Sequence, residues 1–206
     1  MMASILASPG WFAAMRRYGV PRLASFKRYA PNAGLAEMTE FVRKQSFGAF
    51  TWDEVAMYRN VWKRPLLVKG IMHPSDAERA VAIGCEGIVV SNHGGRQVEA
   101  LPAPIDALPA VAAKVGNRAA VLMDSGVRSG MDVVRAVALG ADAAFLGKGF
   151  MWSLGALGEG GPLHAMDLLM EETKAAIGQI GARSVVEART VEIRHPGAYR
   201  FEQHQG

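Results

Sequence analysis

Residues 87–96 read Gly-Ile-Val-Val-Ser-Asn-His-Gly-Gly-Arg, a short apolar run followed at once by a polar, glycine-rich turn. An unbroken apolar run of this length, with no alternation of polar residues, predicts a buried strand of a parallel sheet. The turn that follows places a histidine and an arginine directly at the end of that strand. This stretch therefore predicts an α/β fold with functional side chains at a strand end.

The same strand-and-turn pattern recurs on both sides of this stretch. Further strands are predicted at 66–68, 119–123 and 143–146, and helices at 74–83, 105–115, 129–139 and 162–180. The strand ends lie about 22 to 33 residues apart, a spacing that fits a (β/α) barrel or a doubly wound sheet. No Gly-x-Gly-x-x-Gly motif follows the first strand, which disfavours a dinucleotide-binding Rossmann domain.

Composition narrows the class of protein. The chain has 206 residues, of which half are apolar and a fifth are charged, as expected for one globular domain or a large part of one. The single cysteine, Cys85, excludes an intrachain disulfide framework and a multi-cysteine zinc site, and its small neighbours predict a buried thiol. No apolar run approaches the roughly 18 residues that cross a bilayer, and no signal-peptide pattern is present. We therefore expect a cytoplasmic protein.

Charge is unevenly distributed along the chain. No Asp or Glu precedes Glu37, whereas Arg16, Arg17, Arg22, Lys27 and Arg28 alternate with aromatic residues. Such a segment can be a solvated edge of the domain, a surface that lies on an anionic membrane, or a targeting sequence. We expect a basic segment at 1–50, a main domain at 51–190 and a polar tail at 191–206. A net charge of +4 without a recognition motif gives no reason to expect a nucleic-acid partner.

Polar chemistry follows each of the four predicted strands. The residues concerned are Lys69, then His93 with Arg96, then Asp124 with Arg128, and finally Gly147 with Lys148. Because parallel strands end on the same face of a sheet, and that face holds the active site in a barrel, these groups are predicted to meet in one site.

Each group has a distinct chemical use. Lys69 offers a fixed positive charge for an anion, and His93 is suited to act as a general base near neutral pH. Arg96 carries a planar fork that matches a carboxylate. The last two turns suit a phosphate held by backbone N–H groups. Together they point to an acid substrate and a phosphate-bearing cofactor, with no metal.

The order of these motifs identifies a family resemblance. Residues 67–71, 91–97, 124–130 and 138–142 closely resemble the FMN-dependent α-hydroxy acid dehydrogenase/oxidase family, and the string Ser-Asn-His-Gly-Gly-Arg-Gln at 91–97 is highly specific to it. The match runs from about Thr51 to Glu187. The resemblance implies a TIM (β/α)8-type barrel that is incomplete here, represented by about four C-terminal βα units after a helical N-terminal segment.

The resemblance also implies a role for each site residue. His93 would take the proton from the substrate 2-hydroxyl, or from C2 in a carbanion mechanism, and Arg96 would hold the carboxylate. Lys69 would stabilise the reduced, anionic flavin. Residues that fall where the family binds FMN are Lys69, Ser91, Asp124, Gly126, Arg128, Gly147 and Lys148.

The implied reaction is oxidation of a small (S)-2-hydroxy acid, of the lactate, glycolate or mandelate type, to the 2-keto acid. Oxygen, a quinone or another carrier would accept the electrons, the protein would be a homo-oligomer, and residues 1–50 would contact the inner membrane peripherally. Another phosphate-binding barrel, such as a relative of inosine-phosphate dehydrogenase, would share the phosphate loops but would not account for His93 with Arg96.

Two departures from the family pattern define an alternative. Lys148 stands where the family has an arginine, and Gly149 where it has a proline, so the bidentate fork is lost. The family barrel needs eight strand–helix units and about 250 residues, whereas four are predicted here. The aspartate that pairs with the catalytic histidine cannot be assigned. The alternative is a truncated, non-catalytic half-barrel that self-associates or needs a separate N-terminal half.

Overall fold

A computed structural model describes residues 8–19, 24–45 and 50–195. The chain divides into two compact units, Met1–Thr51 and Trp52–Gly206. Arg22 of the predicted basic segment and residues 196–206 of the predicted tail lie outside the described residues.

The first unit contains helix α2 (Pro9–Tyr18), a 3-10 turn (Ala24–Phe26) and helix α3 (Leu35–Gln45). Aromatic rings are prominent in it: Trp11 and Phe12 meet edge to face with their centroids 5.1 Å apart. Both side chains are nearly half exposed. In the described part of the chain, no helix combines the length and the apolar character needed to cross a membrane.

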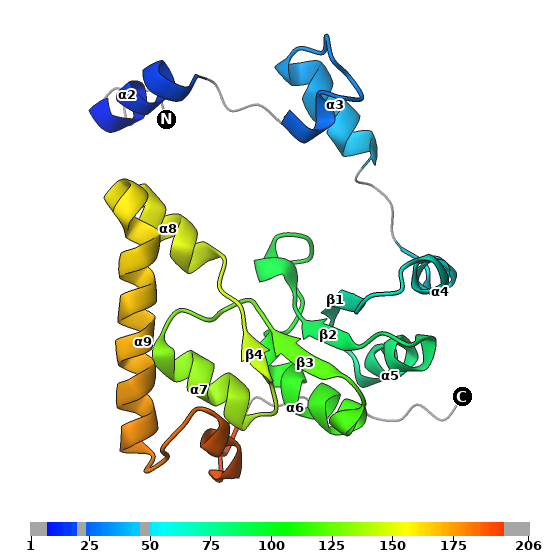
Figure 1. Cartoon of the computed structure of the whole chain (residues 1–206), viewed down its shortest axis with the longest axis vertical. Helices are drawn as coiled ribbons and strands as arrows, with labels where there is room; N and C mark the ends of the chain where they lie inside the picture. Colours follow the sequence, from blue (N-terminus) through cyan, green and yellow to red (C-terminus); the bar gives the residue numbers. More distant parts are fainter. Residues whose placement is uncertain (1–7, 20–23, 46–49, 196–206) are drawn as a thin grey trace. The chain divides into compact units, whose positions relative to one another are not determined.

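The second unit alternates strands and helices (Figure 1). Its elements are α4 (Trp52–Val61), β1 (Leu67–Ile71), α5 (Pro74–Ile83), β2 (Gly87–Val90), α6 (Pro104–Val115), β3 (Ala120–Met123), α7 (Gly130–Ala138), β4 (Ala143–Ala144), α8 (Lys148–Leu157) and α9 (Gly161–Gln179). Short 3-10 turns follow β2 at His93–Gly95 and α9 at Val186–Thr190.

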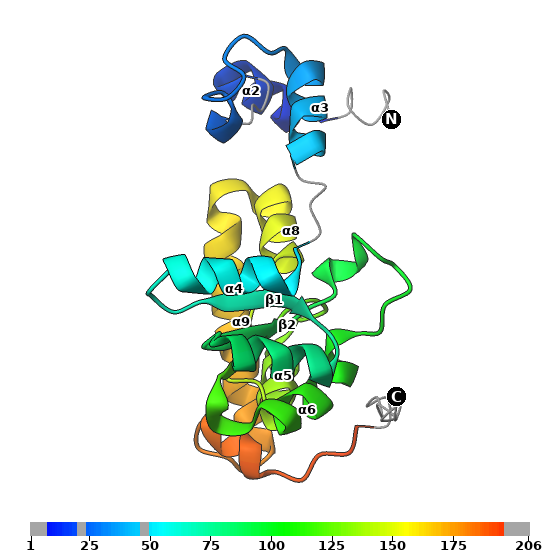
Figure 2. The ribbon, with the colours of Figure 1, turned by 90° about the vertical axis from the view of Figure 1, so that its right-hand side faces the viewer.

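The four strands form one parallel sheet in the order β1-β2-β3-β4. Each strand pairs with the next along the chain, and a helix makes each crossover, as in successive βα units. Figure 2, turned by 90°, shows α5 and α6 packed along the sheet. The predicted α/β class is confirmed.

The two faces of the sheet differ in how they are covered. Alternate side chains of a strand point to opposite faces. Ile88, Val90 and Met123 point to the helix-covered face and are fully buried in the main apolar core. On the other face, Leu67 and Phe145 are 45% and 48% exposed. In the described residues, the second face is therefore only partly covered.

Several boundaries differ from the predicted ones. β1 extends to Ile71, because Gly70 at φ +98° lets the strand continue past an irregularity in its pairing with β2. β4 has two residues instead of four. Helix α8 was not predicted, since it contains Gly149 and Gly155 and begins without a side-chain cap. Cys85 is 3% exposed, which confirms the predicted buried thiol.

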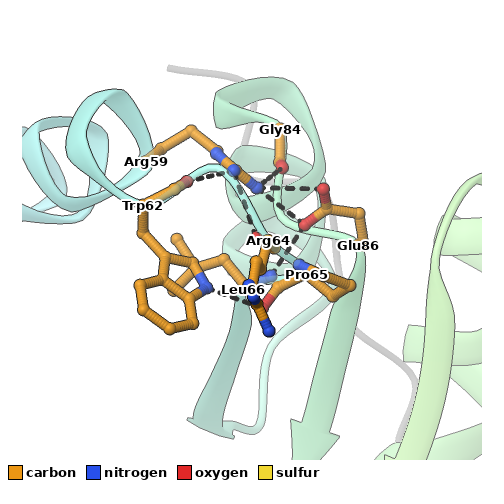
Figure 3. Close-up of polar contacts among 7 residues, drawn as sticks. All are labelled: Arg59, Trp62, Arg64, Pro65, Leu66, Gly84 and Glu86. Carbon is orange, nitrogen blue, oxygen red and sulfur yellow. Dashed lines mark hydrogen bonds and ion pairs between the residues drawn. The ribbon is translucent and has the colours of Figure 1, made fainter.

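The Arg59 side chain of α4 forms hydrogen bonds near the amino ends of β1 and β2 (Figure 3). The Arg59 guanidinium donates to both carboxylate oxygens of Glu86, at 2.9 and 2.8 Å, and to the carbonyl oxygens of Gly84 and Trp62. Glu86 in turn accepts the Leu66 amide at 2.8 Å. These contacts hold the sheet at the end opposite to the carboxyl ends of the strands, where the polar turns lie.

Candidate active site

A cavity of about 810 Å³ opens at the carboxyl ends of the strands. Its walls come from Lys69 of β1 and from the segments that follow β2, β3 and β4. Among the residues that line it are Lys69, His93, Arg96, Asp124, Gly126, Arg128, Gly147 and Lys148. The structure thus brings these eight predicted site residues to one place. Ser91, the ninth, lies at the end of β2, is 1% exposed and accepts a hydrogen bond from Lys69.

Lys69 is held by two partners. Its ammonium lies 2.8 Å from Asp124 Oδ2 and donates to Ser91 Oγ at 2.8 Å. Burial opposes ionisation of Asp124, but hydrogen bonds from Lys69, Ser91 and Ser125 outweigh it and hold the pKa of this carboxyl below its ordinary value. The sequence placed both residues at strand ends without indicating that they form an ion pair.

His93 occupies a left-handed backbone conformation, with φ 56°. Its amide donates to Ser91 Oγ at 3.1 Å. Its ring lies against Gly70, since a Cβ built at that glycine would be 2.9 Å from His93 Cε1. Sequence analysis did not assign Gly70 to the site, although a glycine inside a strand commonly marks a close approach of this kind.

The glycine-rich turn after His93 is fixed from three directions. The Gly94 amide donates to Asn92 Oδ1 at 3.0 Å and to Ser125 Oγ at 2.9 Å. The Lys148 ammonium donates to the Gly94 carbonyl oxygen at 2.9 Å. The turns after β2, β3 and β4 are thereby joined. Sequence analysis missed Ser125, because its partner lies 31 residues away along the chain.

One end of the cavity has the donors that an anion needs. Helix α8 begins beside it, after Gly147, and no side chain caps its first backbone N–H groups. A Cβ built at Gly147 or Gly126 would have no atom within 4 Å, which leaves open space next to the backbone. The Arg128 guanidinium lies 5.0 Å from the centre of the Trp152 ring. These groups fit a phosphate.

Arg96 supplies a further positive charge to the cavity that Lys69, Arg128 and Lys148 also line. Its side chain is exposed and lines the cavity together with His93. No group of three or more His, Cys, Asp or Glu able to hold a metal ion occurs within the described ranges.

Comparison with known proteins gives one consistent result. The family model for FMN-dependent dehydrogenase matches residues 1–195. The L-lactate dehydrogenase of Pectobacterium atrosepticum is 45% identical over 139 residues, which cover 68% of this chain and 36% of that protein. The L-lactate dehydrogenase of Stenotrophomonas maltophilia is 38% identical over 184 residues, which cover 88% of this chain and 48% of that protein.

Solved structures agree with the sequence matches. Mandelate oxidase with 3,3-difluoro-2-hydroxy-3-phenylpropionic acid superposes with a TM-score of 0.67 and 43% identity, covering 70% of this chain and 44% of that one. A mandelate oxidase variant with a monooxide FMN adduct superposes with a TM-score of 0.67 and 44% identity. The match covers 70% of this chain and 46% of that one. The predicted fold class, an incomplete TIM-type barrel, is confirmed. The chain spans less than half the length of these relatives.

Proposed function

This chain belongs to the FMN-dependent dehydrogenase family, and we propose that it takes part in the FMN-dependent oxidation of a small (S)-2-hydroxy acid to the 2-keto acid. One observation carries the proposal: Lys69, His93 and Arg96 line one cavity that also has an anion-binding end. The substrate would be of the lactate, glycolate or mandelate type, in keeping with the names of the relatives.

The substrate is bound and deprotonated by two residues of one turn. Arg96 holds the substrate carboxylate through its planar fork. His93 accepts the proton from the 2-hydroxyl, or from C2 if a carbanion forms first. FMN, when bound, supplies the acceptor for the electron pair that leaves C2.

The cofactor phosphate would be bound by residues that follow β3 and β4. Arg128, Lys148 and the first N–H groups of α8 hold the phosphate, while Gly126 and Gly147 leave room for it. Lys69 and Ser91 would lie beside the flavin ring, where the ammonium of Lys69 would favour the anionic reduced form. Asp124 orients that ammonium at 2.8 Å. Because lysine lacks the arginine fork, Lys148 binds phosphate less tightly than arginine would.

The remaining partners belong to the same proposal. Oxygen, a quinone or another carrier reoxidises the flavin, and the enzyme works as a homo-oligomer on the cytoplasmic side. The basic and aromatic segment 1–50 contacts the inner membrane peripherally, ahead of the barrel segment 51–190 and the tail 191–206. In support of this contact, Trp11, Phe12 and Tyr18 of α2 expose their rings beside Arg16 and Arg17.

Flavin binding and turnover test the proposal together. The purified 206-residue chain is titrated with FMN and with riboflavin, which lacks the phosphate. We expect FMN to bind far more tightly, and lactate, glycolate or mandelate to drive reduction of an artificial dye. Equal affinity for the two flavins would contradict the phosphate site, and a flavin-loaded chain without turnover would contradict the reaction.

A second candidate function follows from the open sheet. Within the described residues β1 and β4 are the two edges of the sheet, and Leu67 and Phe145 are exposed on its partly covered face. Unpaired edges associate with other strands. The chain would then be a non-catalytic half-barrel that self-associates or binds a separate N-terminal half. Size-exclusion chromatography with light scattering tests this, and a stable monomer without turnover would contradict self-association.

A further inference from the structure

We propose that Ser125 is a positioning residue for His93. In this proposal the Ser125 hydroxyl fixes the turn that carries His93 and connects it to the Lys69–Asp124 ion pair. The inference rests on the proposed function of His93 as the base. It concerns a residue that neither the sequence motifs nor the chemistry of the cavity had assigned.

Backbone conformation singles out Ser125. In the described part of the chain, His93 and Ser125 are the two non-glycine residues with positive φ, at 56° and 72°. Such conformations are unfavourable for residues with a Cβ and persist where the surroundings hold them, most often at functional sites. Glycine would adopt this φ more readily. What serine adds at this position is a hydroxyl.

That hydroxyl uses both of its hydrogen-bonding functions. It accepts the Gly94 amide at 2.9 Å and donates to Asp124 Oδ1 at 2.7 Å. The other carboxylate oxygen of Asp124 lies 2.8 Å from Lys69 Nζ. An uninterrupted path of hydrogen bonds therefore runs from the ammonium of Lys69 to the backbone of the turn.

A second path closes the ring. The Ser91 hydroxyl accepts from Lys69 at 2.8 Å and from the His93 amide at 3.1 Å. The consecutive amides of His93 and Gly94 thus end on two serine hydroxyls, both bonded to the same ion pair. Ser91 is fully buried and directly follows the last residue of β2, whereas Ser125 reaches across from the turn after β3. Ser125 is accordingly the member of the ring that ties the His93 turn to a neighbouring strand.

Amide exchange in the flavin-free chain tests this connection directly. Ser125→Gly removes the hydroxyl and relieves the backbone, while Ser125→Ala removes the hydroxyl and keeps the backbone unfavourable. In both variants we expect the Gly94 amide to exchange with water about fivefold faster, the factor for one hydrogen bond of about 1 kcal/mol net. Asn92 Oδ1, 3.0 Å away, remains as a second acceptor and limits the change.

Ser184→Ala is the matched control, since Ser184 also accepts a backbone amide but does not line the cavity. It should leave exchange at Gly94 unchanged. Unchanged Gly94 exchange in both Ser125 variants would overturn the proposal, whether or not the chain binds flavin. The exchange measurement can therefore contradict the role of Ser125 without contradicting the proposed function.

Steady-state kinetics of the FMN-loaded chain separate positioning from folding. We expect Ser125→Gly to lower kcat about tenfold, a fraction of what a general base contributes, with KM nearly unchanged because Arg96 still holds the carboxylate. An unchanged kcat in an active protein would overturn the proposal. If the unsubstituted chain bound no FMN, the proposed function would be contradicted. The amide-exchange measurement would then decide on the role of Ser125.

Discussion

At the residue scale, the ion pair between Lys69 and Asp124 has a direct consequence for pH dependence. The folded-state pKa of Asp124 is lowered, because its hydrogen bonds outweigh the cost of burial. The pair therefore stabilises the fold above the ordinary carboxyl pKa of about 4, and the contribution is lost as pH falls through the lower folded-state value.

We expect Asp124→Asn to lower the melting temperature at neutral pH, and we expect the difference from the unsubstituted chain to disappear in acid. Thermal unfolding of both proteins across an acidic series checks the sign. A difference that stays constant from neutral to acidic pH would mean that the carboxylate does not supply this stability.

The close approach of Gly70 to the His93 ring leads to a prediction about the position of the imidazole. A side chain at this residue would meet His93 Cε1 at 2.9 Å, so Gly70→Ala must displace the imidazole. We expect turnover by the FMN-loaded chain to fall about a hundredfold, as a displacement of about 1 Å can cause, while FMN affinity stays nearly unchanged.

Gly95→Ala is the control for backbone strain. Gly95 also has a positive φ, 72°, but a Cβ there would have no atom within 4 Å. Equal losses of turnover in the two variants would show that strain in the backbone, and not contact with His93, is responsible.

At the element scale, the close contact between α7 and α9 depends on one glycine. A Cβ at Gly130 would lie 2.1 Å from the Thr173 amide nitrogen, and the Gly130 amide donates to Glu172 at 2.8 Å. We expect Gly130→Ala to force the helices apart and to lower the free energy of unfolding by about 1–3 kcal/mol or more. Chemical denaturation measures the change.

Gly178→Ala, in the helix α9 that Gly130 of α7 contacts, is the matched comparison. No atom lies within 4 Å of a Cβ there, so alanine should stabilise the helix by up to about 1 kcal/mol. If both substitutions had the same sign, the packing argument for Gly130 would be wrong.

How far the elements could be predicted depends on where their stability originates. Helix α7 was predicted from Ser129, and the structure shows the capping box with Asp132 that local sequence indicates. Helix α5 likewise begins at Pro74 and ends at Ile83, directly before Gly84, which has φ 96°. Helix α8 also has a glycine of positive φ after its last residue, Gly158 at 63°, but no side chain caps its start, and it packs against α9. Such contacts between distant residues are invisible to local patterns.

The site shows the same division. The strand ends could be located because the apolar runs stop at them, and the motif at 91–97 carried a family resemblance that the comparisons confirm. The Lys69–Asp124 pair and the Ser125 hydroxyl could not be predicted in this way. Both join residues from different βα units, and their geometry depends on how the sheet twists.

At the scale of the whole molecule, four parallel βα units bring their polar residues together in one cavity. The proposed base His93, the proposed carboxylate-binding Arg96 and the proposed phosphate end at the start of α8 all come from these units. The comparisons match the chain to less than half the length of its relatives.

Anaerobic reduction of FMN bound to the purified chain tests the central claim most directly. We predict that the flavin absorbance bleaches when an (S)-2-hydroxy acid is added, that the (R) enantiomer has no effect, and that His93→Gln prevents bleaching while FMN stays bound. A chain that takes up no FMN, or bleaching that persists in the His93 variant, would contradict the claim.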